Sequence, residues 1–356
     1  MKGYAVNFSF DDQQREFSAT LRRALEKKAP LARWLQPLPD DPAWSILTNE
    51  LQAAAPDLGE DVGGLDLTAV ELAITAEELG RVVAPTAFVA GVFAQGLLAA
   101  AGAATRDDLV AAAEGRPLLL GGEPAGDWAE LTLEEDTTLS GSFLAPVGAR
   151  TAEVIVALAN NPSGGRVLAV GDLAGASVDP VDGIDPTAGS ARVVLDRLPV
   201  VVHELVDPDA AVAFARRRAR LAVAAQALGG ARACLVLTSE YATQREQFGV
   251  PIGRFQAVKH RLADLFVETE LAASAVYLAA CETDPSTAEL ATDIAYEVAT
   301  ATYRRAAGDC IQLHGGIGFT WEHVAHLHLE RSSLLASLAP GASRATRYDQ
   351  LASADT

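Results

Sequence analysis

Two long helical patterns are separated by a short segment that cannot be helical, and this break constrains the fold more than any other stretch of the chain. Apolar residues recur with helical spacing across 221–235 and again across 258–276. In the intervening segment 248–253 two glycines favour turns, and Pro251 lacks an amide hydrogen. The pattern predicts a helical hairpin whose tight loop carries Arg245 at its edge.

The hairpin loop and a later turn, roughly one helix pair apart, carry two motifs that occur in one family. The first motif is Arg245-Glu-Gln-Phe-Gly249, followed by Phe255-Gln256 and Leu262-Ala-Asp264, and the second is Gln312-Leu-His-Gly-Gly-Ile-Gly-Phe319. They resemble the flavin-contacting loop and the C-terminal glycine-rich turn of the acyl-CoA dehydrogenase family. A lone Gly-Gly-x-Gly is a weak signal, but two matches in the right order are a strong one.

The division of the chain follows the change of hydrophobic period. Residues 1–115 and 206–356 read as helical, whereas short β-branched and apolar runs between turn clusters fill 116–205. We therefore expect an α+β fold with an N-terminal helical domain, a small middle β-domain and a C-terminal four-helix-bundle domain. The family resemblance implies the same arrangement.

Composition and charge exclude several classes of partner. The chain has 356 residues and a formal net charge of −19, which argues against binding to nucleic acid or an anionic membrane. Its first ten residues lack an apolar run of signal-peptide length, and no segment reads as a membrane span, so we expect a cytoplasmic protein. Cys234, Cys281 and Cys310 lie in helical patterns without a Cys-x-x-Cys pair, which favours buried free thiols.

The resemblance implies a flavin, a glutamate base and an acyl-CoA substrate. In the family the glutamate takes the α-proton while the β-hydrogen leaves as hydride to FAD, giving a trans-2-enoyl-CoA. At the usual place for that glutamate this chain has the carboxylate-free stretch 335–343, around Leu338, and at the alternative place a gap-free alignment puts Ala219. We therefore expect no catalytic residue at either position.

The segments that hold the flavin ring in the family are also altered. Only Gly122-Glu-Pro-Ala-Gly-Asp127 remains of one, and Gly141-Ser-Phe-Leu-Ala-Pro-Val-Gly-Ala149 lacks the aromatic and hydroxyl groups of the other. In the family's tetramers, the arginine loop and the glycine-rich turn reach across a dimer interface to the neighbouring subunit's FAD. The residues expected to make these contacts are Arg245, Phe248, Gln256, Gln312, Gly315 and Gly316.

The resemblance thus implies a non-catalytic subunit of a heteromeric acyl-CoA dehydrogenase that shares FAD with a paralogous catalytic subunit. Heteromers of this kind act in actinobacterial steroid and cholesterol side-chain breakdown, which implies a steroid-CoA substrate by analogy. The expected electron acceptor is electron-transfer flavoprotein. Two alternatives stay open: a self-sufficient enzyme that uses Glu330 or Asp349 as its base, and a structural subunit that binds no flavin.

Other charged groups have simpler explanations. Arg245 could pair with a surface carboxylate, and the run Arg216-Arg-Arg-Ala-Arg220 is by default a solvated helix face, with contact to a CoA phosphate or an acidic partner as the minority alternative. His314 is expected to pack or hydrogen-bond rather than act as a base. His323, His326 and His328 lie near Glu322 and Glu330, but we expect no metal site there.

Overall fold

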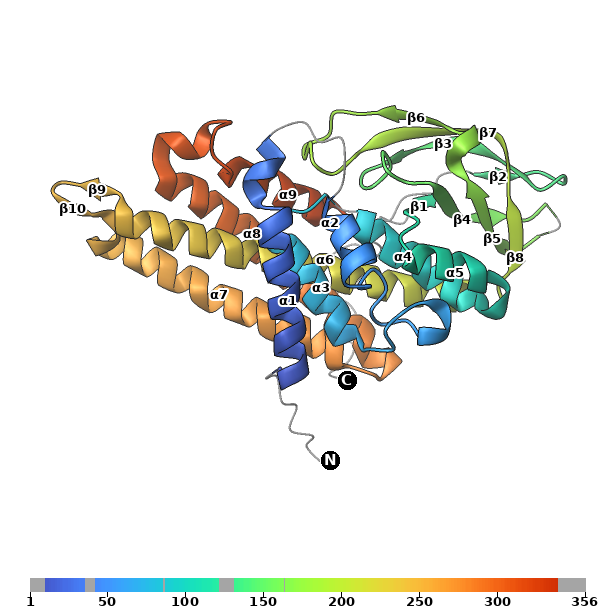
Figure 1. Ribbon diagram of the computed structural model, residues 1–356, viewed down its shortest axis with the longest axis horizontal. Helices are drawn as coiled ribbons and strands as arrows, with labels where there is room; N and C mark the ends of the chain where they lie inside the picture. The colour runs from blue at the N-terminus through green and yellow to red at the C-terminus, as the bar shows by residue number, and fades with distance from the viewer. Residues whose placement is uncertain (1–9, 36–41, 86, 122–130, 163, 339–356) are drawn as a thin grey trace, which may run out of the picture.

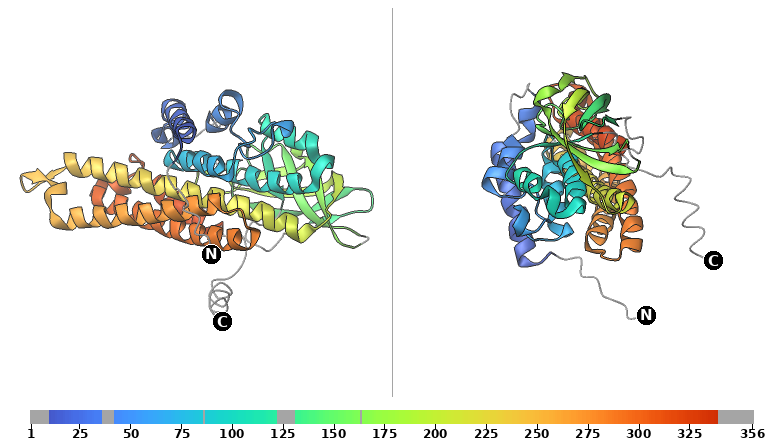
Figure 2. Two further views of the ribbon diagram at one scale, coloured as in Figure 1. Left: turned by 90° about the horizontal axis from the view of Figure 1, so that it is seen from below. Right: turned by 90° about the vertical axis from the view of Figure 1, so that its right-hand side faces the viewer.

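The computed structural model describes residues 10–35, 42–85, 87–121, 131–162 and 164–338. Long helices form one elongated body, and a sheet lies at one end of it, opposite a small hairpin (Figure 1). Figure 2 shows that the long helices run side by side and that the shorter N-terminal helices cover one of their sides. This arrangement confirms the expected combination of helical N-terminal part, middle sheet and helical C-terminal part.

Several of the helices begin at clear sequence signals. Those of the N-terminal part are α1 (Asp12–Lys28), α2 (Pro42–Ser45), α3 (Ala69–Arg81), α4 (Ala87–Ala101) and α5 (Arg106–Ala113). The C-terminal ones are α6 (Pro208–Gln244), α7 (Gln256–Cys281), α8 (Pro285–His314) and α9 (Ala325–Ser337). Asp11 and Thr68 cap α1 and α3 in capping boxes, and Asp207 and Asp284 cap the proline-led starts of α6 and α8. The expected helix after Thr86 is α4, although Thr86 itself lies outside the described residues.

The middle part is an eight-stranded sheet. Its strands are β1 (Leu118–Gly121), β2 (Thr132–Leu133), β3 (Thr138–Ala145), β4 (Val154–Asn160), β5 (Arg166–Asp172), β6 (Ser177–Pro180), β7 (Ala191–Pro199) and β8 (Val201–Glu204). The order is β6-β7-β3-β2-β4-β5-β8, and β1 also pairs in parallel with β4, on the side opposite β5 that it shares with β2. β4 is buried along nearly its whole length, whereas buried and exposed residues alternate along β7. The sheet therefore packs partly on the helices and partly faces solvent.

Two glycines allow α3 and α6 to cross at close range. A Cβ at Gly229 would overlap the carbonyl oxygen of Glu77, and one at Gly80 would overlap the backbone of Gln226. Because the backbones approach this closely, the largest hydrophobic cluster is continuous from the N-terminal helices into the C-terminal bundle. The two helical parts share one core.

A buried arginine joins all three parts of the chain. The Arg331 guanidinium on α9 donates to the Asp185 carboxylate, to Thr187 Oγ1 at 2.7 Å and to the carbonyl oxygen of Ala84 at 2.7 Å. Asp185 and Thr187 lie between β6 and β7, and Ala84 follows α3. Only 1% of Arg331 is exposed, so all of its hydrogen bonds are made inside the protein.

The expectation of a solvated arginine face on α6 is wrong. Arg218 and Arg220 are only 5% and 4% exposed. Arg218 donates to both oxygens of Asp57, at 2.8 and 2.6 Å, and Arg220 donates to Asp293 of α8. Dense cationic sequence normally marks a wet surface, but here long side chains reach acidic partners that are distant in sequence.

Cysteine burial is as expected for two of the three thiols. Cys234 and Cys310 are buried, but Cys281 is exposed because α7 ends at that residue. Two helical stretches, Phe88–Ala113 and Pro208–Gln244, are long and apolar enough to cross a membrane. In their most apolar windows 67% and 72% of the residues are buried inside the protein, as core helices are.

Candidate functional site

The break between the helical patterns is a β-hairpin at the far end of the bundle. Strands β9 (Glu246–Gln247) and β10 (Val250–Pro251) pair antiparallel, and Phe248 and Gly249 form the turn with φ angles of +56° and +77°. Positive φ at both central positions is the geometry of a tight two-residue hairpin turn. A positive φ is unusual for a bulky side chain. The phenyl ring of Phe248 lies at the tip of the hairpin and is 93% exposed.

Arg245 lies where helix α6 becomes the hairpin. Its N–H donates to the carbonyl oxygen of Tyr241 at 2.8 Å, and its own carbonyl oxygen accepts from the Ile252 N–H at 2.8 Å. Its side chain is exposed and makes no ion pair with any residue that the structure describes. The backbone is therefore fixed while the guanidinium stays available, and the simpler explanation that Arg245 pairs with a surface carboxylate finds no partner among those residues.

The glycine-rich turn lies at the end of α8. Gly315 has a φ of +64°, and a Cβ added at Gly315 or Gly316 would meet nothing within 4 Å. Gln312 and both glycines are exposed. The backbone of this turn is thus open to close approach by another molecule.

A contact that the sequence analysis missed joins the two motifs. The Tyr241 hydroxyl donates to the carbonyl oxygen of His314 at 3.3 Å, and the two rings stack with centroids 4.3 Å apart. The ring of His314 also lies 4.4 Å from that of His323, and its Nδ1–H donates to the carbonyl oxygen of Cys310 at 2.7 Å. His314 therefore packs and hydrogen-bonds, as expected. Its contact with Tyr241 brings Arg245 and Gly315 to one end of the molecule. Tyr241 lies four residues before the first motif, about one helical turn, and this proximity is the only sequence signal for its role.

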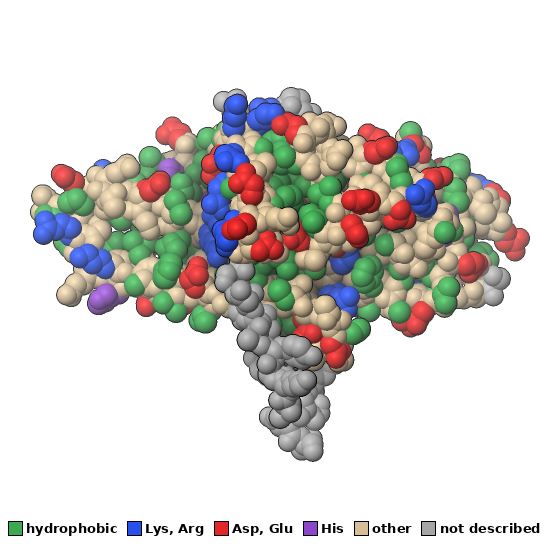
Figure 3. All heavy atoms as spheres, turned by 60° about the horizontal axis from the view of Figure 1, so that its bottom comes forward, with side chains coloured by type: hydrophobic (Ala, Val, Ile, Leu, Met, Phe, Trp, Pro, Cys, Tyr) green, Lys and Arg blue, Asp and Glu red, His purple; other side chains and the backbone are tan. Residues whose placement is uncertain are grey.

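The charge at this end suits a phosphate-bearing ligand. Arg245, Arg254 and Lys259 are exposed around the hairpin of a strongly acidic chain. Figure 3 shows Lys, Arg and His side chains at the left-hand end of the molecule, where the hairpin lies in Figure 1. An unpaired guanidinium, open glycine backbone and exposed Gln256 and Gln312 are donors that fit the expected FAD contacts.

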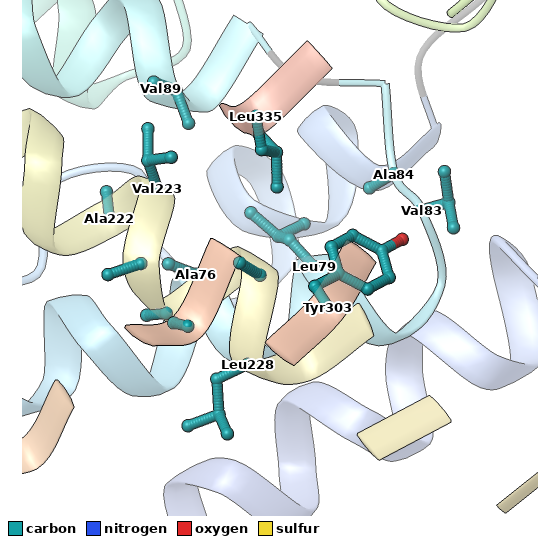
Figure 4. Packing of buried hydrophobic residues seen from close by; sticks show 14 of the residues in the cluster. Ala76, Leu79, Val83, Ala84, Val89, Ala222, Val223, Leu228, Tyr303 and Leu335 are labelled. Carbon is teal, nitrogen blue, oxygen red and sulfur yellow. The ribbon is translucent and has the colours of Figure 1, made fainter. Parts of the chain in front are cut away.

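The two positions expected for a catalytic glutamate meet at one apolar cavity. Ala219 comes from α6 and Leu338 follows α9, and both line the same apolar cavity. The cavity is lined by Val89, Ala90, Phe93, Leu119, Leu120, Ala145, Pro146, Val147, Ala219, Val223 and Leu338. Figure 4 shows Val89 and Val223 on facing helices of this region, with Leu335 opposite. None of the described residues that line the cavity can ionise.

Glu330 has the electrostatics of a base but not the position. Burial and the nearby Asp185 carboxylate raise the pKa of Glu330 to about 7, and its Oε2 atom is buried without a partner among the described residues. However, Glu330 does not line the cavity, and it precedes Leu338 by eight residues, about 12 Å along a helix. Asp349, the other carboxylate considered, lies outside the described residues.

The segments expected to clamp a flavin ring are only partly described. Residues 122–127 lie outside the described part of the chain. Residues 141–149 form the end of β3 and the loop after it, from which Ala145, Pro146 and Val147 line the cavity. These three side chains offer no hydrogen-bonding group to a ring.

The histidines near the glycine-rich turn do not converge. His328 is fully buried and bonds through Nδ1 to the Tyr303 hydroxyl at 2.9 Å, whereas His326 Nδ1 contacts the carbonyl oxygen of His323 at 2.6 Å. Burial lowers the pKa of His328 to about 4, so its ring is neutral at pH 7. Within the part of the chain that the structure describes, no group of three or more metal-ligating side chains is found.

Sequence comparisons cover most of the chain. Residues 11–108 match the profile "Acyl-CoA dehydrogenase, N-terminal domain", and residues 213–348 match "Acyl-CoA dehydrogenase, C-terminal domain". The chain is 34% identical over 299 residues to acyl-CoA dehydrogenase IpdE2 of Mycobacterium tuberculosis, covering 84% of this chain and 82% of that protein. It is 38% identical to acyl-CoA dehydrogenase FadE34 of the same organism over 170 residues, 47% of this chain and 23% of FadE34.

Solved structures with the same fold include two whose titles name a pair of proteins. A chain of the "Tcur3481-Tcur3483 steroid ACAD G363A variant" superposes with a TM-score of 0.80 at 26% identity, covering 96% of this chain and 97% of that one. A chain of the ChsE4-ChsE5 complex from Mycobacterium tuberculosis superposes with a TM-score of 0.83 at 22% identity, covering 99% and 100%. The second likeness concerns the fold alone.

Proposed function

Because this chain belongs to the acyl-CoA dehydrogenase family, whose members are FAD-dependent, we propose that it is the non-catalytic subunit of a heteromeric acyl-CoA dehydrogenase. In this proposal a paralogous chain supplies the base and holds the flavin ring, and the present chain contributes contacts to the remainder of that FAD. The bound FAD would supply the acceptor for the hydride that leaves the acyl-CoA.

The observation that carries the proposal is the composition of the apolar cavity. Its two expected base positions hold Ala219 and Leu338, and neither side chain can accept a proton. α-Proton abstraction needs a carboxylate whose pKa is raised toward the operating pH in just such a dry site. An apolar cavity that lacks this carboxylate supports the binding of a ligand but not the abstraction of its α-proton.

The hairpin end supports the second half of the proposal. Arg245, Phe248 and Gln256 are exposed there with Gln312 and Gly315, and the Tyr241–His314 contact holds the two motifs together. These residues lie far along the bundle from the sheet, so they cannot serve a flavin ring seated against this chain's own strands (Figure 1). Their position suits contacts to the FAD of a neighbouring subunit.

The named relatives suggest the substrate and the setting. One structural neighbour is titled a steroid acyl-CoA dehydrogenase made of two proteins, and another is a two-protein complex. We extend both features to this chain, with a steroid-type acyl-CoA thioester as substrate and a heterotetramer as assembly. The family resemblance adds electron-transfer flavoprotein as the cytoplasmic electron acceptor.

Co-expression with a paralogous catalytic subunit tests the proposal through the ratio of flavin to protein chains. The expected complex is yellow, contains fewer flavins than chains, and oxidises acyl-CoA, whereas this chain alone binds little flavin. Arg245→Ala is expected to lower the flavin content of the complex, and Arg192→Ala, the same charge change on exposed β7, is expected to leave it unchanged. A yellow homotetramer of this chain with turnover of its own would overturn the proposal.

One alternative has a specific observation in its favour. The raised pKa of Glu330 would suit a relocated base in a self-sufficient enzyme. In that case the isolated chain turns over acyl-CoA, and Glu330→Gln abolishes turnover. For a purely structural subunit, the flavin content of the complex would be the same with and without the Arg245 side chain.

A further inference from the structure

One fully buried amide of α6 has no hydrogen-bond partner. Gln226 is 0% exposed, and neither its Nε2 nor its Oε1 atom is bonded to any residue that the structure describes. A buried carboxamide carries two donors and an acceptor, and leaving them unsatisfied is costly. Such a side chain is unusual in a core unless it meets a polar group that comes from elsewhere.

Gln226 does not itself line the apolar cavity, but helical geometry places it just beyond the cavity on α6. It follows Ala219 by seven residues, so it lies only about 20° away from this cavity-lining residue around the axis of α6. It is about 4.5 Å beyond Val223, the other α6 residue in the lining, along the same axis. Since helical side chains lean toward the N-terminus of their helix, the carboxamide leans back toward the turn of Val223.

A second buried glutamine shows the contrast. Gln95 of α4 is 1% exposed, and its Nε2 donates to the carbonyl oxygen of Ala54 at 3.3 Å, although its Oε1 has no partner among the described residues. It lies about 140° around α4 from Ala90, which lines the cavity, so it belongs to the opposite face of its helix. Gln95 therefore hydrogen-bonds a loop on the far side of its helix, whereas Gln226 has no such partner among the described residues and lies on the same side of α6 as Ala219.

We propose that this cavity binds a mostly apolar molecule with a single oxygen function, an alcohol or a ketone, and that the Gln226 carboxamide hydrogen-bonds this oxygen. The apolar walls remove the hydrocarbon part of the ligand from water, and the amide selects molecules that carry an oxygen at the inner end. This inference deepens the proposed function, because it concerns the same cavity, but the binding it describes requires neither a base nor the hairpin contacts.

The probes p-cresol and p-xylene test the proposal, because they differ only in a hydroxyl and a methyl group. Titration calorimetry on the full-length chain, in complex with its partner if that is needed for solubility, gives a Kd for each. The ratio of the two values is then compared between wild type and Gln226→Met, so that the cost of transfer from water cancels. We expect the ratio to shift about tenfold toward p-xylene in the variant, the loss of one hydrogen bond.

Two further variants complete the test. Gln95→Met is expected to leave the ratio unchanged, and Ala90→Phe, which fills the cavity, is expected to abolish binding of both probes. An unchanged ratio in Gln226→Met, binding that survives Ala90→Phe, or no binding of either probe to the wild-type chain would each overturn the proposal. Flavin content enters none of these readouts, so failure here and failure of the proposed function are distinguishable.

Discussion

The Tyr241 hydroxyl donates to the carbonyl oxygen of His314 at 3.3 Å, while the two rings stack 4.3 Å apart. Tyr241 lies in the last turn of α6 and His314 ends α8, so this contact ties the hairpin to the glycine-rich turn. Both motifs that point to a shared cofactor thereby become parts of one surface.

Removal of the Tyr241 ring is expected to separate the motifs. In the proposed complex Tyr241→Ala should lower the flavin content, because Arg245 and Gly315 are no longer held together. Tyr241→Phe keeps the stacking and loses only one long hydrogen bond, so it should retain most of the flavin. Flavin absorbance per chain measures both, and equal values for the two variants would contradict the role of stacking.

Phe248, in the hairpin turn, is expected to lower the stability of the protein and to increase its flavin binding. Its positive φ costs a bulky residue about 1–2 kcal/mol, which Phe248→Gly should recover in part. The same change removes an aromatic ring that is 93% exposed and expected to contact the cofactor. We expect an unchanged or higher Tm together with lower flavin content; a lower Tm would show that the ring stabilises the fold.

Glu77 of α3 holds three helices together. It accepts from Arg232 of α6 at 2.7 Å, from Arg81 at 2.8 Å and from the Tyr277 hydroxyl of α7 at 2.7 Å. Glu77→Gln removes the nearest carboxylate from two largely buried guanidinium groups, leaving Arg81 with Glu78 at 3.3 Å and Arg232 with Glu270 at 3.6 Å. The change should cost about 3 kcal/mol. Glu16→Gln, which breaks an exposed pair with Arg23, should cost under about 1 kcal/mol in the same urea titration.

The same carboxylate makes stability depend on pH. Burial acts to raise the pKa of Glu77, but Arg232, Arg81 and the Tyr277 hydroxyl outweigh it and hold the pKa below the usual 4.5. A depressed folded-state pKa stabilises above the unfolded value, and the contribution is lost as pH falls below about 4.5. Unfolding free energies between pH 7 and pH 3 should therefore fall less steeply in Glu77→Gln than in wild type.

Glu330 makes stability depend on pH in the opposite direction to Glu77. Its pKa is raised from 4.5 to about 7, so the folded state binds more protons than the unfolded state between these values and stability declines as pH rises through them. Glu330→Gln should stabilise the protein above pH 7, by about 1 kcal/mol after allowance for solvent screening, and have little effect at pH 4. Thermal unfolding of both proteins at pH 4 and pH 8 measures the difference, and a gain of equal size at both pH values would contradict it.

A methyl group at the α3–α6 crossing should be costly. Gly229→Ala directs a Cβ into the carbonyl oxygen of Glu77 and should destabilise the protein by about 3 kcal/mol. Gly308→Ala on α8 meets nothing within 4 Å and should stabilise the chain by about 0.5–1 kcal/mol. Urea midpoints of the two variants should thus move in opposite directions.

Local patterns predicted the elements because helices and turns depend on neighbouring residues. Helical spacing on either side of Pro251 predicted α6 and α7, and Asp11 and Thr68 begin α1 and α3 as capping residues do. The same patterns failed for Arg218 and Arg220, because the acidic partners Asp57 and Asp293 lie on other elements. A run of charged residues indicates a solvent-exposed face only when no oppositely charged residue from another part of the chain packs against it.

The sequence by itself determined the family, the three-part order of helices and strands, and the absence of a carboxylate at Ala219 and Leu338. Only the tertiary structure decided that these two residues line the same cavity, that Gln226 is buried without a hydrogen-bond partner among the described residues, and that Tyr241 meets His314. Residue identity and spacing act along the chain, whereas a cavity or a stacked pair forms between segments that only packing brings together.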